Sequence, residues 1–156
     1  MNVVLVEPEI PPNTGNVARL CAATQTVLHL IEPFGFKLDD AHLKRAGMDY
    51  WRQVEWHRWP NWTAFAAQAA PGARLWFVES DGPQLYTGVK FAPGDYLVFG
   101  RETAGLPRQL LAENPGQWLR IPMFNPRSRS LNLSNCAALV LFEALRQQGF
   151  AGEVRD

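Results

Sequence analysis

The stretch RIPMFNPRSRSLNLSNCAALVLFEAL, residues 120–145, predicts a strand, a polar loop and a capped helix in succession. The apolar run Trp118–Ile121 is typical of a buried strand, and Pro122 ends it. After the loop, Asn132 precedes a long helical pattern. An Asn side chain at such a position accepts hydrogen bonds from the free N–H groups of the first helical turn. Gly149 lies where a left-handed residue commonly ends a helix.

The loop between this strand and this helix carries more polar groups than a helix cap needs. Asn125, Arg127, Ser128, Arg129 and Ser130 bring two guanidinium groups together with hydroxyl and amide groups. Loops held by a rigid scaffold are where binding and catalytic residues usually lie. The segment SLNLSN alone is explained equally well by helix capping. The loop that contains the arginines is therefore the better indication of a functional site.

Length and composition set limits on the class of protein. A chain of 156 residues fits one domain, and its formal net charge of zero argues against indiscriminate binding of polyanions. No apolar run predicts a signal peptide or a membrane span. The cysteines, Cys21 and Cys136, lie beside alanines in helical patterns, which favours buried thiols over a disulfide or a nucleophile. We therefore expect a cytoplasmic protein without membrane association.

Predicted strands and helices alternate along the whole chain. Besides the strand before Pro122, strands are expected at Val3–Val6, Val27–Ile31, around Val54, Leu75–Val78 and Tyr96–Phe99. Helices are expected at Val17–Thr24, Asp39–Arg45, Asn61–Ala70 and Pro107–Ala112. This order predicts an α/β fold: a single domain with a mostly parallel sheet flanked by helices. His29, inside the second strand, is expected to be a partly buried, hydrogen-bonded residue and not a ligand.

Three polar turns each follow a predicted strand on its carboxyl side: Asn13–Asn16, Gly100–Gly105 and Asn125–Asn132. In a parallel sheet the carboxyl ends of the strands share one edge, so these turns are expected to converge there. The glycines that bracket the second turn would allow backbone to approach a ligand closely. The sequence thus places one candidate site at this edge.

The residue types available at this edge exclude several kinds of chemistry. The chain has no GxGxxG or P-loop motif, no GxSxG elbow, and no His or Cys spacing that suits a metal. What remains is backbone groups, Arg, Asn, Ser and the carboxylate of Glu102. This inventory suits a polar cofactor and the positioning of a weak nucleophile, with catalysis by proximity and charge stabilisation.

Three segments resemble, in order and spacing, the three motifs of the SPOUT RNA methyltransferases. They are NTGNVAR at 13–19, FGRETAGLP at 99–107, and IPM followed by SRSLNLSN within 121–135. The resemblance covers nearly the whole chain and is strongest to the short bacterial members without an added RNA-binding domain. It implies a single SPOUT domain over residues 1–156, a C-terminal trefoil knot, a homodimer and S-adenosylmethionine as methyl donor. It also implies 2'-O-methylation of the wobble ribose, C or U at position 34, in leucine tRNAs.

The resemblance also assigns roles to particular positions. It implies cofactor contacts at Val78, Gly100, Ile121, Ser130 and Leu131, and catalytic roles for Arg19, Glu102, Ser130 and Asn132. It leaves Arg101, Arg127 and Arg129 for RNA, and it implies no metal. A guanidinium pKa lies above about 12, so we expect Arg19 to orient the ribose hydroxyl and stabilise developing charge, and not to act as a base.

The chain departs from the usual family pattern at a few positions. Arg101 stands in place of a proline, Ala104 in place of an arginine, and Phe142 where tyrosine is common, and the 125–130 loop is one residue longer. These departures concern RNA contacts more than the cofactor pocket.

Two other functions stay open at this point: the same chemistry on ribosomal RNA, and a non-catalytic module that binds RNA or nucleotides and has kept the pocket.

Overall fold

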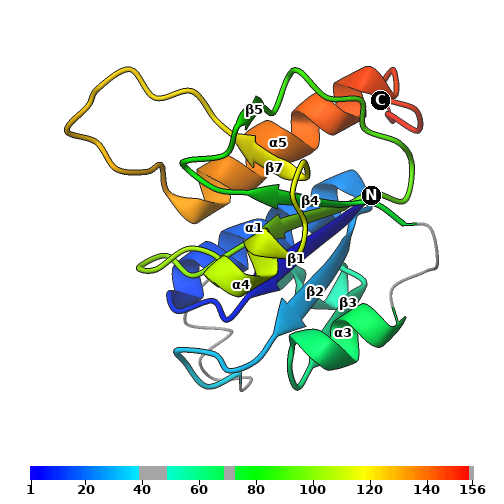
Figure 1. Cartoon of the computed structure of the whole chain (residues 1–156). Helices are drawn as coiled ribbons and strands as arrows, with labels where there is room; N and C mark the ends of the chain where they lie inside the picture. Colours follow the sequence, from blue (N-terminus) through cyan, green and yellow to red (C-terminus); the bar gives the residue numbers. More distant parts are fainter. Residues whose placement is uncertain (39–48, 69–72, 155–156) are drawn as a thin grey trace.

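A sheet of parallel strands forms the centre of the molecule (Figure 1). The computed structural model describes residues 1–38, 49–68 and 73–154. Within them the strands are β1 (Asn2–Val6), β2 (Val27–Ile31), β3 (Trp56–Trp59), β4 (Leu75–Val78), β5 (Gln84–Leu85), β6 (Tyr96–Phe99) and β7 (Trp118–Arg120). Their order across the sheet is β3-β2-β1-β6-β4-β7-β5, and every pairing is parallel.

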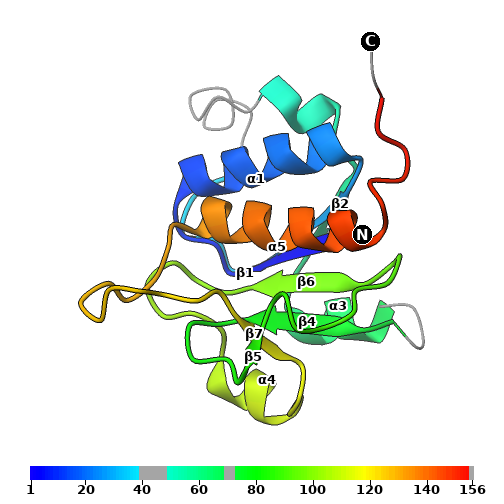
Figure 2. The same ribbon diagram turned by 90° about the horizontal axis from the view of Figure 1, so that it is seen from above.

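Helices cover both faces of this sheet, so the fold has three layers (Figure 2). Helices α1 (Pro11–Thr24) and α5 (Leu133–Gln147) pack together on one face. Helices α3 (Trp62–Gln68) and α4 (Arg108–Ala112) pack on the other. A short 3-10 helix, η1 (Asp49–Arg52), precedes β3 and contacts α1. The predicted α/β domain with helices flanking a parallel sheet is confirmed.

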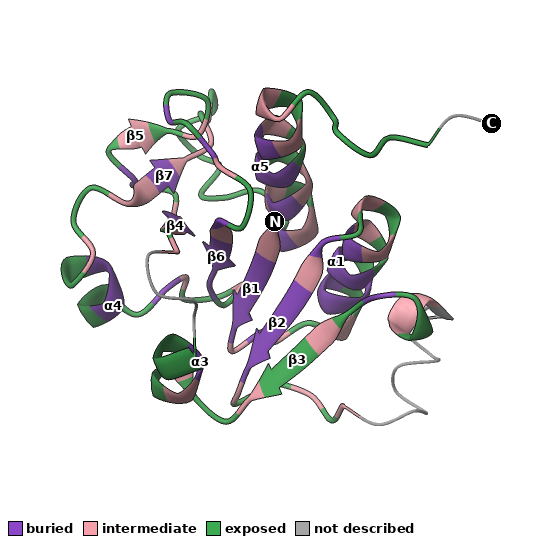
Figure 3. Ribbon diagram, turned by 90° about the vertical axis from the view of Figure 1, so that its right-hand side faces the viewer, coloured by how far each residue is buried: buried purple, intermediate pink, exposed green. Residues whose placement is uncertain are grey.

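Alternation along the inner strands explains the two hydrophobic cores. In β1, Val3 and Leu5 pack into the core under α1 and α5, whereas Val4 and Val6 pack into the core under α3 and α4. Successive residues of a strand point to opposite faces, so a strand covered on both faces is apolar throughout. β1 and β2 are accordingly buried along nearly their whole length, and the edge strand β3 is largely exposed (Figure 3).

Most elements lie where the sequence predicts them, and the misses are local. The strands at 27–31, 75–78 and 96–99 are confirmed with the predicted bounds. The prediction of a strand around Val54 is wrong, because β3 starts at Trp56. β5 has only two residues, too few to show any period, and was not predicted. The helix expected at Asp39–Arg45 lies outside the described residues.

The predicted turn at Asn13–Asn16 is also wrong, because α1 begins at Pro11 and these residues form its first turns. Prolines at the first positions of a helix cost no hydrogen bond, since those N–H groups have no partner within the helix. Pro11 and Pro12 therefore start the helix instead of separating it from the strand. Asn13 is buried as a result and points along the helix start toward the carboxyl edge of the sheet.

The aromatic and basic residues of β3 pack at the edge of the sheet. The indole of Trp59 donates to Nδ1 of His29 at 3.1 Å, and Nε2 of His29 lies 3.2 Å from Oδ1 of Asn2. The two contacts are satisfied together by a neutral imidazole with its proton on Nε2. His29 is thus a buried, hydrogen-bonded residue, as predicted.

Candidate functional site

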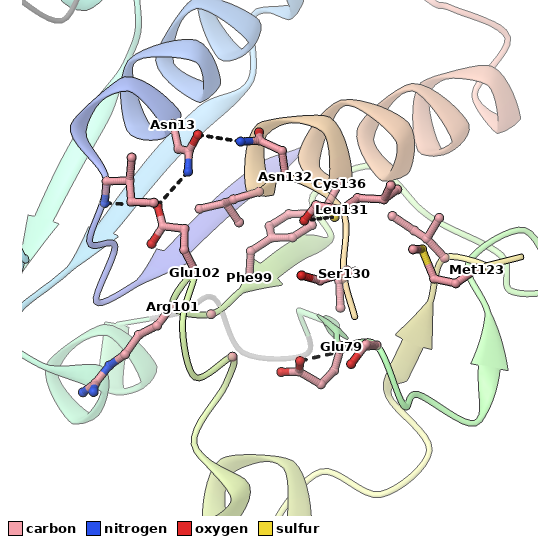
Figure 4. Close-up of a pocket in the computed structure, with 17 residues that line it drawn as sticks. Asn13, Glu79, Phe99, Arg101, Glu102, Met123, Ser130, Leu131, Asn132 and Cys136 are labelled. Atoms are coloured by element: carbon pink, nitrogen blue, oxygen red, sulfur yellow. Dashed lines mark hydrogen bonds between the residues drawn. The ribbon is translucent and has the colours of Figure 1, made fainter. Parts of the chain in front are cut away.

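A cavity of about 300 Å³ opens at the carboxyl ends of β4, β6 and β7, beside the start of α5 (Figure 4). All five positions predicted to contact a cofactor line it: Val78, Gly100, Ile121, Ser130 and Leu131. Arg101, Glu102 and Asn132 line it as well. The structure therefore brings together, at one edge of the sheet, residues at or just beyond the ends of three strands and residues of the loop that precedes α5.

A chain of side-chain hydrogen bonds joins the three polar segments around this cavity (Figure 4). Asn132 donates through Nδ2 to Oδ1 of Asn13 at 2.9 Å. Asn13 in turn donates through Nδ2 to Oε1 of Glu102 at 3.1 Å. Asn132 also caps α5, because its Oδ1 accepts from the backbone N–H of Ser134 at 2.9 Å. Both amides are thus fixed in orientation, and the predicted convergence of the three segments is confirmed.

Glu102 closes the N-terminus of α1 from a segment distant in sequence. The residue at the N-cap, Ile10, offers no side-chain acceptor. Oε2 of Glu102 accepts from the N–H of Glu9 at 2.8 Å, and Oε1 accepts from the N–H of Ile10 at 3.2 Å. A carboxylate at this end of a helix also interacts favourably with the helix dipole. These hydrogen bonds fix the carboxylate of Glu102 against the start of α1, and its catalytic role stays a prediction.

The turn after β6 folds back tightly on itself. The backbone groups of Arg101 and Gly105 bond to each other at 3.1 and 2.9 Å. A Cβ atom placed on Gly100 would lie 2.2 Å from the carbonyl carbon of Gly105. Gly100 is therefore required for this turn. The absence of a side chain at Gly100 lets two parts of the backbone approach closely, and contact of this turn with a ligand stays a prediction.

Glu79 also lines the cavity, although it was not among the predicted site residues. Its Oε2 accepts from the N–H of Leu106 at 2.7 Å. Gly105 has a positive φ of 68°, and a Cβ atom there would lie 2.6 Å from the Glu79 carboxylate. Glu79 therefore holds the turn after β6 in place. The available signal was its position directly after a buried strand at the carboxyl edge of the sheet.

The four arginines singled out in the sequence have different environments. Arg101 lies at the cavity and forms an ion pair with Glu7. Arg19 is exposed on α1, and its guanidinium lies 4.9 Å from the ring centroid of Tyr50. Arg127 and Arg129 are exposed in the loop before α5. Of the four, the structure places only Arg101 among the residues that line the cavity.

Both cysteines are free, as expected. Burial raises the pKa of the Cys21 thiol to about 12. The thiol of Cys136, at the cavity, also has a raised pKa, first because of burial and further because of the nearby Glu79. A thiol with a raised pKa stays protonated at neutral pH and is a poor nucleophile. Neither cysteine has the environment of a reactive thiolate.

The lining of the cavity combines apolar walls with fixed polar groups. Val78, Phe99, Ile121 and Leu133 supply apolar surface, and Glu79 supplies a carboxylate. Pockets for organic cofactors have this composition: mostly apolar, with a few placed polar groups that set orientation. Within the described residues no group of His, Cys, Asp and Glu could hold a metal ion. The cavity thus fits an organic cofactor that carries both an apolar ring system and charged groups.

Comparison with known proteins shows the family of this chain. The sequence profile of the SpoU rRNA Methylase family matches residues 1–142. This chain belongs to that family. A relative from Saccharophagus degradans, named tRNA (cytidine(34)-2'-O)-methyltransferase, is 54% identical over 154 residues, with 97% of each chain covered.

Two solved structures show the same architecture as this SpoU family member. One, described as "Structural insights into the 2-OH methylation of C/U34 on tRNA", matches with a TM-score of 0.90 and 44% identity, covering 96% of each chain. The other is an AdoMet-bound rRNA methyltransferase from Sinorhizobium meliloti, with a TM-score of 0.81 and 28% identity. That match covers 93% of this chain and 55% of the other.

Within the described residues, no helix is long and apolar enough to cross a membrane.

Proposed function

We propose that this protein transfers a methyl group from S-adenosylmethionine to the ribose 2'-hydroxyl of the wobble nucleotide, C or U at position 34, in leucine tRNAs. The observation that carries the proposal is the cavity itself, because the three segments that resemble the SPOUT motifs meet around it through Asn13, Glu102 and Asn132. Close relatives named for methylation of cytidine 34 support the choice of substrate.

In this proposal the residues of the cavity hold the cofactor, which supplies an electrophilic methyl group when bound. The side chains of Val78, Ile121 and Leu131 contribute apolar walls, and Ser130 contributes a polar group. Glu79 can balance the positive charge of the methyl donor. Glu102 and Asn132 act by holding the loops in position, since their polar atoms form hydrogen bonds with residues at the starts of α1 and α5. Catalysis then comes from proximity and orientation of two reactants.

Arg19 is proposed to act on the ribose. It lies on an exposed position of α1 and not at the cavity, so the RNA must bring the hydroxyl between Arg19 and the bound cofactor. A guanidinium stays charged, so it can orient the hydroxyl and stabilise developing alkoxide charge, while another group accepts the proton. Arg101, Arg127 and Arg129 are proposed to contact phosphates.

Methyl transfer to defined RNAs tests this function. Purified protein is incubated with labelled S-adenosylmethionine and unmodified transcripts of leucine tRNAs, and nucleoside mass spectrometry locates the modified ribose. We expect 2'-O-methylation at position 34 and none when that nucleotide is a 2'-deoxynucleotide. Methylation of ribosomal RNA fragments instead would overturn the substrate assignment. Binding of RNA and cofactor without turnover would indicate a non-catalytic module.

The proposal includes a homodimer in the cytoplasm, with residues 1–156 acting as one methyltransferase domain. A domain of this size has little surface with which to hold a tRNA stem and loop, and two copies double it. Leu139 and Phe142 on α5 are 41% and 49% exposed, and they lie three residues apart on the same face of the helix. Apolar side chains in this arrangement suit a contact between two copies.

A further inference from the structure

The loop from Pro122 to Leu131 projects from the body of the protein, as two perpendicular views show (yellow to orange in Figures 1 and 2). Phe124 in this loop is 94% exposed, more than any other large hydrophobic residue among those described. Its neighbour Met123 lines the cavity, and so does Ser130 at the other end of the loop. An exposed aromatic ring is thus carried on a segment that starts and ends at the candidate active site.

Local hydrogen bonds hold the backbone next to this ring. The N–H of Arg127 donates to Oδ1 of Asn125 at 3.0 Å, and the N–H of Ser128 donates to the carbonyl oxygen of Asn125 at 3.0 Å. An Asn side chain that accepts from the backbone two residues later is a common way to stabilise a turn. The turn directly after Phe124 therefore has its own bonds. The exposed ring of Phe124 is thus directly followed by a hydrogen-bonded turn.

The charges around Phe124 indicate what it faces. Arg127 and Arg129 are exposed in the same loop, and residues 121–142 contain no Asp or Glu. An exposed aromatic ring beside exposed guanidinium groups, in a segment without carboxylates, is the composition with which proteins bind single-stranded nucleic acid. There, bases stack on the aromatic rings and cations contact the backbone. A patch of this composition is poorly suited to an apolar protein partner, because such interface cores are depleted of charge.

We propose that Phe124 stacks on an unpaired base of the substrate RNA, next to the nucleotide whose ribose reaches the cavity, while Arg127 and Arg129 contact the flanking phosphates. The inference rests on the function proposed above and adds a specificity-determining residue to it. Because Met123 and Ser130 tie the loop to the cavity, the base held by Phe124 must be a near neighbour of the methylated nucleotide. Stacking is tolerant of base identity but requires an unpaired base.

The test compares variants at position 124 with a matched control, using an unmodified leucine tRNA transcript. Phe124→Ala should weaken RNA binding by roughly five- to a hundredfold, the usual effect of removing one stacking ring. Phe124→Trp should restore it, and Phe124→Leu should not. Phe150→Ala removes another exposed ring, 44% exposed, which lies just after α5, and should leave the affinity unchanged. Cofactor affinity, measured by calorimetry, should be the same in all of them.

Two further measurements separate stacking from other causes. The salt dependence of RNA binding should keep its slope in Phe124→Ala, whereas Arg127→Ala should make the slope shallower by about one unit. A 2-aminopurine base placed beside the target nucleotide should lose fluorescence on binding to the unaltered protein and not to Phe124→Ala.

Several results would overturn the inference. A Phe124→Ala protein that binds RNA normally would overturn it. A Phe124→Ala protein that loses cofactor affinity or dissociates into monomers, with its RNA affinity unchanged, would overturn it as well. The unaltered protein is assayed alongside. If it fails to methylate the transcript, the proposed function fails. If it methylates and Phe124→Ala binds and reacts equally well, only the stacking inference fails.

Discussion

Glu102 gives the clearest case of a single residue whose partners decide its role. Its carboxylate accepts three hydrogen bonds, two from the backbone of residues 9 and 10 and one from Asn13. Replacement by Gln would turn an NH₂ group toward an N–H donor and leave that donor without a partner. An unsatisfied group of this kind typically costs about 1 to 3 kcal/mol.

We therefore expect Glu102→Gln to lower the free energy of unfolding by about 1 to 3 kcal/mol in urea denaturation. Glu113→Gln is the control, because the exposed Glu113 accepts from one side chain, Gln109. Its stability should change little. A Glu102→Gln protein of normal stability that no longer transfers methyl groups would instead identify Glu102 as a catalytic residue.

Arg19 and Arg127 are expected to contribute to different steps. Arg19→Ala should lower the single-turnover rate of methyl transfer about a hundredfold, the usual cost of one positioned electrostatic contact, with tRNA affinity nearly unchanged. Arg127→Ala should weaken tRNA binding and change the rate at saturating tRNA little. The two carboxylates before α1 have partners other than Arg19, because Glu7 pairs with Arg101 and Glu9 accepts from Thr103. The guanidinium of Arg19 lies over Tyr50. An Arg19→Ala protein with a lowered melting temperature but a normal rate would show that Arg19 has a structural role.

At the scale of elements, the turn after β6 depends on Gly100. A Cβ atom added here would lie 2.2 Å from the carbonyl carbon of Gly105 and 2.3 Å from the nitrogen of Leu106. Gly100→Ala should therefore displace the turn, weaken cofactor binding, and lower the free energy of unfolding by about 1 to 3 kcal/mol.

Gly88→Ala is the matched control for this substitution, since its Cβ would meet only the carbonyl oxygen of Leu85, at 3.3 Å. Calorimetry with S-adenosylmethionine and urea denaturation measure the two effects. Undiminished cofactor affinity in Gly100→Ala would show that the turn does not contact the cofactor.

The contact between β2 and β3 predicts a pH dependence of stability. Burial, and to a smaller extent the nearby His57, lowers the pKa of His29 from 6.5 to about 4. Because the unfolded chain binds this proton more readily than the folded one, stability falls as the pH falls from about 6.5 to about 4. The loss is on the order of 3 kcal/mol. Urea denaturation across this range should show a smaller loss for His29→Gln, and an equal loss in both proteins would contradict the assignment.

At the scale of the whole molecule, the main prediction is a homodimer. Sedimentation at micromolar concentration should give twice the monomer mass. Phe142→Glu should shift the protein toward the monomer, because a charge would be buried in the proposed contact. Arg146→Glu, which lies on the same helix near its end, is the control, because it changes the charge without removing apolar surface. A monomer that retains full activity would count against the dimer. The trefoil knot stays a prediction of the family resemblance.

Much of the fold follows from the sequence because its signals are local. Strands such as 27–31 and 96–99 are apolar runs bounded by turn residues, and Asn132 caps α5 through a hydrogen bond to a residue two positions away. Such features depend on near neighbours, so a pattern of residues predicts them. The three motifs also indicated which loops form the site, and the cavity contains all five predicted cofactor positions.

Only the tertiary structure decided how these loops are held. Glu102 bonds to residues about 90 positions earlier, and Asn132 to one 119 positions earlier. Glu79 supports a turn 27 positions later. No local pattern encodes which donor lies opposite a given carboxylate, because that depends on the order of strands in the sheet. The same order, which brings the carboxyl ends of β4, β6 and β7 together, places Glu102 against the start of α1.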